Sequence, residues 1–155
     1  TPSAILLGAG ATRYFLALLQ AAIILVLGAA AFGVAWGQPV AVAALVVVYA
    51  LVGAGAGLLL GAVCRTADQA NSIGIPIGIG LGMLGGCMWP LDVVPPAVRT
   101  AGHLTPHAWA MDAFVVLIDE GGGIADITSQ LLVLALYAAV LLTVAASLLR
   151  RTLTR

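Results

Sequence analysis

The chain has 155 residues, of which 63% are apolar and only 8% are charged, and its formal net charge is zero. A soluble domain carries about 25% charged residues, so this composition excludes a water-soluble globular fold and indicates an integral membrane protein. The six basic residues are all arginines and are dispersed along the chain, which excludes a basic surface for nucleic acid.

Three long runs contain no Asp, Glu, Lys or Arg: residues 14–64, 69–91 and 127–149. A bilayer core about 30 Å thick needs about 20 such residues per helix, so the first run has room for two crossings. Its natural division is Trp36-Gly37-Gln38-Pro39, because Gly suits the end of a helix and Pro the first turn of the next. We therefore expect an all-α integral membrane fold, one domain over 1–155, with membrane helices at about 13–36, 40–64, 68–89 and 125–149.

The arginines predict how these helices are oriented. Alternating crossings place five of them on one side, namely Arg13, Arg65, Arg150, Arg151 and Arg155, and only Arg99 on the other. Cytoplasmic loops carry an excess of Arg and Lys, so the side with five arginines is predicted to be cytoplasmic. Both ends of the chain then lie inside the cell, and the chain is a multi-pass protein of the cell membrane, in contact with lipid.

Glycines recur every four residues along two of the expected helices. They are Gly53, Gly57 and Gly61 in the second, and Gly74, Gly78 and Gly82 in the third. Removing Cβ along one stripe lets two backbones approach closely, which is how helices associate in lipid. We expect these stripes to be helix-packing faces, inside one subunit or at a dimer seam or hinge. The third helix opens with Thr66-Ala67-Asp68-Gln69, a capping box.

Residues 92–119 are expected to form a short re-entrant helical hairpin on the outside of the membrane. Its two pieces are each roughly 20 Å long, too short to span. Thr105-Pro106 is typical of a helix start and Glu120-Gly121-Gly122-Gly123 of a helix stop. The candidate gate residues of this region are Gly85, Gly86, Pro90, Pro95, Thr105, Pro106, His107, Trp109 and Asp112. The hairpin is either a plug that seals the outer mouth or a gate for cargo.

The pair His103 and His107, with Asp112 nearby, raises the question of a metal site. Pro106 lies between the two histidines and breaks the helix that would bring them onto one face. Capping and interfacial hydrogen bonds by the imidazoles are favoured, and no metal or other bound cofactor is expected. The sequence has no Gly-x-Ser-x-Gly and no His-Glu-x-x-His motif, so we expect a transport subunit rather than an enzyme.

The order of these features resembles the ABC-2 family of exporter permeases. The most specific part is Gly-Gly-x-Met-x-Pro-Leu-x-x-x-Pro from Gly85, followed by Leu-Thr-Pro-His-Ala-Trp-Ala-x-Asp from Leu104. The resemblance implies that the chain is the C-terminal four-helix portion of a longer permease with six membrane helices. It also implies that residues 1–12 are a remnant of a cytoplasmic coupling segment, with Arg13 as the only charge available for docking to an ATPase.

The resemblance further implies a second permease subunit, as homodimer or heterodimer, and cytoplasmic ATP-binding cassette proteins that hydrolyse ATP. The sequence contains no Lys and hence no Gly-x-x-x-x-Gly-Lys-Ser/Thr phosphate loop, so ATP is expected to be used by the partner. Apolar walls with few charges favour an amphipathic, drug-like or lipid-like cargo.

Two other classes of function stay open. A secondary transporter or channel would need coupling charges inside the membrane, and the expected spans contain no Asp, Glu, Lys or Arg apart from Arg13, Asp68 and Asp126 at their ends. A non-transporting membrane scaffold is consistent with the glycine stripes, and it predicts that replacing Pro90 and Pro106 leaves the protein's role intact.

Overall fold

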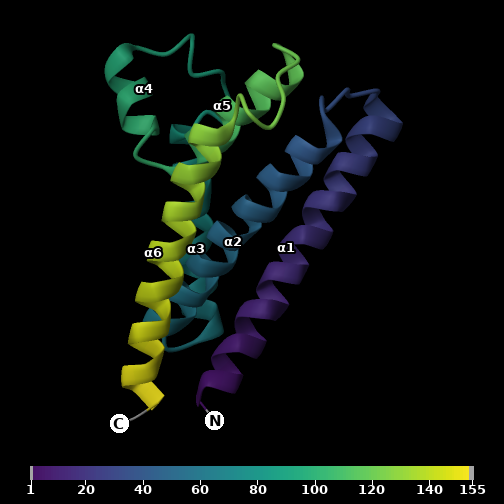
Figure 1. Cartoon of the computed structure of the whole chain (residues 1–155). Coiled ribbons are helices and arrows are strands. Elements are labelled where there is room, and N and C mark those ends of the chain that lie inside the picture. Colours follow the sequence, from purple (N-terminus) through teal and green to yellow (C-terminus); the bar gives the residue numbers. More distant parts are fainter. Residues whose placement is uncertain (1, 154–155) are drawn as a thin grey trace.

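The computed structural model describes the backbone of residues 2–153 and the side chains of residues 8–150. Within this range the chain is all-helical: α1 Pro2–Phe32, α2 Pro39–Val63, α3 Ala67–Leu84, α4 Pro96–Gly102, α5 Pro106–Ile118 and α6 Thr128–Leu153. The Pro2 end of α1 and the Leu153 end of α6 lie at the same end of the bundle, whereas the short helices α4 and α5 gather at the opposite end (Figure 1). Arg151 and Arg155 fall outside the described side chains.

Three of the described helices are long and apolar enough to cross a membrane: Gly8–Phe32, Pro39–Val63 and Thr128–Arg150. These three helices indicate that the chain is a multi-pass membrane protein. The helix α3 has 18 residues, and its first turns carry Asp68, Gln69 and Asn71. A crossing by α3, and with it the four-span topology and the re-entrant path of the hairpin, stays a prediction.

The helix α1 ends earlier than the sequence suggested. We expected an end near Trp36, but Gly33 adopts a positive φ of 67° and α1 stops at Phe32. The chain then folds back, so that the Trp36 indole N–H donates to the Leu25 carbonyl at 2.9 Å and the ring lies against Gly28. At its other end α1 runs unbroken from Pro2, so the described part of the predicted coupling segment 1–12 belongs to the same helix as the span, while Thr1 lies outside the described residues. The coupling role of that segment stays a prediction.

The predicted start signals of α2 and α3 are confirmed. Pro39 stands in the first turn of α2. In the capping box of α3 the Gln69 amide donates to the Thr66 hydroxyl at 3.1 Å, and the Gln69 side chain accepts from the Arg65 amide at 2.9 Å. The end of α3 lies at Leu84 rather than near residue 89, because Gly86 takes a φ of 85° and turns the chain.

The buried core lies between α2, α5 and α6, toward the end of the bundle that carries the hairpin. Its fully buried large side chains are Leu45, Leu117, Ile127 and Leu134. The helix α6 begins at Thr128, three residues later than expected, after a turn in which the Thr128 hydroxyl donates to the Ala125 carbonyl at 2.9 Å. By contrast α1 and α3 leave most of their apolar surface exposed, as expected for helices that face lipid or other membrane helices.

Candidate functional site

The two halves of the predicted gate motif meet in space where the end of α3 touches the start of α5. An added Cβ at Gly85 would lie 2.7 Å from Thr105 Oγ1 and 2.9 Å from the Ala108 amide nitrogen, and it would collide with the His107 side chain. Real Cβ atoms do not approach that closely, so only glycine permits this contact. The structure therefore brings together Gly85, Thr105 and His107, which the sequence places about 20 residues apart.

The connector after α3 forms a tight turn around the side chain of Leu91. The Cys87 amide donates to the Gly82 carbonyl at 2.9 Å, and a Cβ at Gly86 would stand 2.8 Å from Leu91 Cγ. From the far side Gly102, at the end of α4, approaches the Leu84 carbonyl so closely that an added Cβ would lie 2.6 Å from it. The connector and α4 thus close over the end of α3.

Thr105 occupies the position before α5 that we expected, with Pro106 as the first helical residue. Its hydroxyl does not cap the helix, however. It donates to the Gly102 carbonyl at 2.8 Å, and the side chain is 2% exposed. The hydroxyl therefore fastens the turn between α4 and α5 instead of satisfying a free amide of α5. Pro95 stands in the same position before α4.

His103 joins the end of α4 to the middle of α5. Its Nε2 lies 2.7 Å from Asp112 Oδ2, and its Nδ1 lies 2.8 Å from the Arg99 carbonyl oxygen. The Trp109 indole N–H donates to the His103 carbonyl at 2.9 Å, and its ring meets the imidazole edge to face. The hydrogen bond to the Arg99 carbonyl, opposed by partial burial and aided by Asp112, raises the pKa of His103 above its ordinary value. This imidazole therefore forms hydrogen bonds as expected, while its position at the membrane interface stays a prediction.

His107 has a different environment. Its ring meets that of Tyr49 on α2 with centroids 5.9 Å apart, and its buried Nδ1 has no hydrogen-bond partner. Burial lowers the pKa of His107, because it disfavours the charged imidazole. Within the part of the chain that the structure describes, no three His, Cys, Asp or Glu side chains gather into a group that would hold a metal ion.

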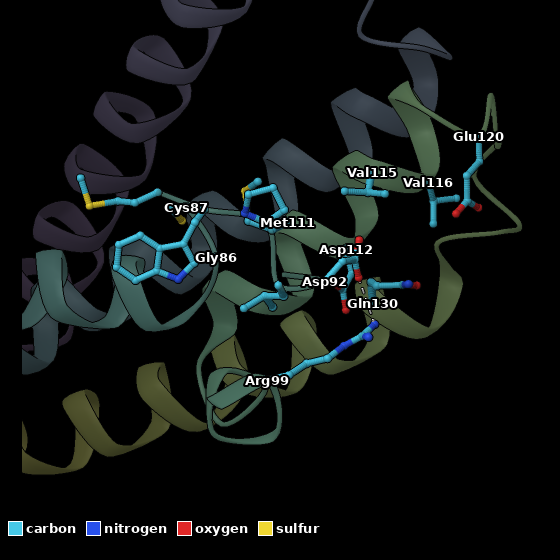
Figure 2. Close-up of a pocket in the computed structure, with 14 residues that line it drawn as sticks. Gly86, Cys87, Asp92, Arg99, Met111, Asp112, Val115, Val116, Glu120 and Gln130 are labelled. Carbon is cyan, nitrogen blue, oxygen red and sulfur yellow. Dashed lines mark ion pairs between the residues drawn. The ribbon is translucent and has the colours of Figure 1, made fainter. Parts of the chain in front are cut away.

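A pocket of about 510 Å³ lies beside these contacts. Its walls come from the connector after α3, from α4, α5 and the start of α6, and they combine Trp89, Pro90 and Met111 with charged side chains. In Figure 2 the Arg99 side chain extends along the pocket toward Asp92, with which it forms an ion pair at 3.6 Å. Asp112 lines the same pocket.

A second cavity, also about 510 Å³, is a groove between α1, α2 and α5. Its lining is almost entirely apolar, and Gln20 and Tyr49 contribute the polar side chains. Gly53 also lines this groove, and no atom lies within 4 Å of the position that its Cβ would take.

The predicted glycine stripes have mixed surroundings within this chain. The Arg13 side chain lies over two of the α2 glycines, because a Cβ at Gly57 would stand 3.1 Å from its Cδ and one at Gly61 would stand 3.5 Å from its Nη2. A Cβ at Gly74 would meet Leu60 at 2.6 Å. A Cβ at Gly78 would meet no atom within 4 Å, and the atoms nearest to a Cβ at Gly82 would lie 3.9 Å away. A dimer seam along the stripes, and ATPase docking by Arg13, stay predictions.

Several residues that hold the structure together were not singled out by the sequence. Gly55, outside the four-residue stripe, is where α2 packs most tightly on α6, since its Cβ would lie 2.9 Å from Leu141 Cβ. The Gln38 side chain accepts from the Ile124 amide at 3.0 Å and so joins two loops far apart in the chain. A polar side chain directly before the predicted helix start at Pro39 is the signal that would have indicated Gln38.

Comparisons with known proteins give a family but no solved structure that matches. The family model described as ABC-2 family transporter protein matches residues 1–147. The chain is also similar to the linearmycin resistance permease protein LnrN of Bacillus subtilis (strain 168), with 33% identity over 109 residues, covering 70% of this chain and 28% of that protein. No solved structure matches the chain significantly. The chain thus spans less than a third of that permease. The family match covers nearly the whole of this chain, which therefore belongs to the ABC-2 transporter family.

Proposed function

We propose that this chain is part of the membrane permease of an exporter driven by a separate ATP-binding cassette ATPase. The observation that carries the proposal is the ABC-2 family match over residues 1–147, which includes the hairpin. The similar protein of Bacillus subtilis is named a resistance permease, which supports export as the direction of transport. ATP is used by the partner, and a second permease subunit completes the pathway.

The proposed cargo is amphipathic, either drug-like or lipid-like. The groove between α1, α2 and α5 supports this proposal, because about 510 Å³ is the size of a pocket for a drug-sized molecule. Its apolar walls suit an acyl or polycyclic body, while the Gln20 amide and the Tyr49 hydroxyl offer hydrogen bonds to a polar end. The groove contains no charged side chain, which disfavours a small ion.

The hairpin is proposed to be the outer gate of this pathway, in the plasma membrane, with both ends of the chain in the cytoplasm. The arginines support this sidedness: Arg65 between α2 and α3, and Arg150 near the end of α6, belong to the end of the bundle opposite α4 and α5 (Figure 1). Arg13, near the same end, is the proposed contact for the ATPase.

The test uses the full-length permease, coexpressed with its cassette ATPase and reconstituted in proteoliposomes with a fluorescent amphiphile. Gly53→Phe places a large ring in the open groove, so we expect ATP-driven export to fall at least several-fold while ATPase binding is kept. The matched control is Val47→Phe, because Val47 lies on the same helix, is exposed and does not line the groove. Export by the Val47→Phe variant should equal that of the parent protein.

Three results would contradict the proposal. One is that no cassette ATPase associates with the permease or stimulates export. Another is transport driven by an ion gradient without ATP, which would favour a secondary transporter. The third is an unchanged biological role after folded, inserted protein loses Pro90 and Pro106, which would favour a scaffold.

A further inference from the structure

Both ring nitrogens of His103 face hydrogen-bond acceptors. Nδ1 lies 2.8 Å from the Arg99 carbonyl oxygen and Nε2 lies 2.7 Å from a carboxylate oxygen of Asp112. A carbonyl oxygen and an ionised carboxylate can only accept, whereas a neutral imidazole donates from one nitrogen and not from both. The two hydrogen bonds therefore form together only when the His103–Asp112 pair carries one proton more than a neutral imidazole with an ionised carboxylate. Because the ordinary pKa of an imidazole exceeds that of a carboxyl, this proton belongs on the ring.

The groups around the imidazole come from four segments. From α4, the Arg99 guanidinium repels the imidazolium and lowers the pKa of His103, while the Arg99 carbonyl raises it. From α5, Asp112 raises the pKa. In the connector after α3, Asp92 partly offsets the Arg99 charge through the ion pair at 3.6 Å. From α6, the Tyr137 hydroxyl donates to the carbonyl of the next residue, Leu104, at 2.9 Å.

These contacts give α4 its attachment to α5. The helix α4 has seven residues, Pro96–Gly102, too few to be stable without tertiary contacts. On the α5 side it is held by the His103–Asp112 pair and by the indole of Trp109 on the His103 carbonyl. Asp112 also lines the pocket of about 510 Å³ that includes Arg99. A change in the protonation of His103 therefore acts at once on the α4–α5 junction and on the charge of the pocket wall.

We propose that His103 is a proton-operated latch, which ties the end of α4 to Asp112 of α5 most strongly while the imidazole is doubly protonated and loosens this tie when the proton leaves. A neutral imidazole keeps only one of the two hydrogen bonds, and the Asp112 carboxylate then faces the pocket without a cationic partner. This inference concerns the hairpin itself, and it does not depend on which cargo the protein moves or on what drives transport.

The sign of the pH dependence follows from the raised pKa of His103. A group whose folded pKa lies above its ordinary value of 6.5 stabilises the folded arrangement fully below that value and loses this contribution as the pH rises through the folded pKa. The latch is therefore closed in mildly acidic solution and opens toward alkaline pH. If α4 faces the outside, it responds to the external pH.

The direct test is a nitrogen NMR titration of the intact protein in nanodiscs, labelled in its histidines. His103→Gln and His107→Gln each remove one signal and so identify the signals of the two histidines of this chain. We expect His103 to titrate above 6.5 and His107 below it. Asp112→Asn should lower the pKa of His103 and leave that of His107 in place.

Arg99→Gln is the matched variant with the opposite effect. It keeps the backbone carbonyl that accepts from Nδ1 but removes the repelling cation, so the pKa of His103 should rise. Titration of His103 at or below 6.5, or a pKa of His103 that neither variant moves, would overturn the proposal.

Whether α4 moves is tested by spin labels at Thr100→Cys on α4 and Val115→Cys on α5, with the native cysteines, Cys64 and Cys87 among them, replaced by serine. We expect a narrow distance distribution at mildly acidic pH that broadens as His103 loses its proton. With Asp112→Asn the distribution should be broad at every pH. A distribution that ignores pH, or that changes equally in the Asp112→Asn variant, would show that the imidazole titrates without acting as a latch.

Discussion

Gly53 and Gly55 lie about half a helical turn apart in α2, on opposite faces. Replacing each of them by alanine should change the free energy of unfolding in opposite directions. Replacing either by alanine raises intrinsic helix propensity by about 1 kcal/mol, a contribution that cancels when the two variants are compared. At Gly55 the new methyl group would lie 2.9 Å from Leu141 Cβ and 3.3 Å from the Leu142 amide nitrogen. Neither atom is the end of a flexible side chain, so α2 and α6 must separate. At Gly53 no atom lies within 4 Å.

Overpacking a close-packed site costs about 1–3 kcal/mol, so the free energy of unfolding of Gly55→Ala should fall below that of Gly53→Ala by about this amount. The measurement is the free energy of reversible unfolding of the full-length protein in bicelles, with unfolding driven by a steric trap or by denaturant. Equal losses in the two variants would refute the reasoning, because Gly53 would then lie in a packed face rather than in an open groove. A larger loss at Gly53 would indicate a second subunit seated on that side of α2.

Three further predictions follow from single contacts. Gly85→Ala should destabilise the hairpin by about 1–3 kcal/mol in thermal unfolding, since its Cβ would meet the Ala108 backbone and the side chains of Thr105 and His107. Gly80→Ala, inside α3, should not destabilise it, since the Cβ at this position meets nothing within 4 Å. Tyr137→Phe removes the donor to the Leu104 carbonyl and should cost about 0.5–1.5 kcal/mol in the same assay; no loss would mean that water replaces the bond. Burial lowers the pKa of His107, so stability should fall as the pH drops below 6.5 toward the folded pKa, and His107→Gln should remove this loss; identical pH profiles of stability would contradict it.

The sequence predicted those helix limits that depend on local chemistry. Pro39 fits only the start of a helix, and Thr66 with Gln69 forms a cap from neighbouring residues, so both positions could be identified without tertiary information. The end of α1 could not, because Gly33 and Gly37 both take a positive φ and either could have ended the helix. What selects Gly33 is the return of Trp36 onto α1, a contact between residues eleven positions apart.

The candidate site was predictable in part for the same reason. The predicted gate motif marked two segments that meet in space, since glycine and proline at fixed spacing reveal tight turns. It did not reveal that Gly85 lies against Thr105, or that His103 rather than His107 pairs with Asp112. Periodicity assigns residues to a helix face, but pairing across a turn depends on how two short helices dock, and a single sequence carries no direct signal of that geometry.

The α4 part of the hairpin is joined to the rest of the bundle in a way that differs from the packing of α2, α5 and α6. The α2–α6 contact at Gly55 is close and apolar, and separating it would open a void that lipid cannot fill well. Around α4 and in the loops at the same end of the bundle the ties include single polar bonds: His103 to Asp112, the Tyr137 hydroxyl to the Leu104 carbonyl, and the Ile124 amide to Gln38.

Water can replace polar bonds of this kind at the membrane surface, so each contributes only about 0.5–1.5 kcal/mol, or somewhat more where a charge takes part. Differences of a few kcal/mol are the range in which a bound ligand or a proton shifts a conformational population. The α4 part of the hairpin can therefore rearrange while α2, α5 and α6 stay packed. A gate needs this combination, because its opening must not cost the stability of the helices that form the pathway.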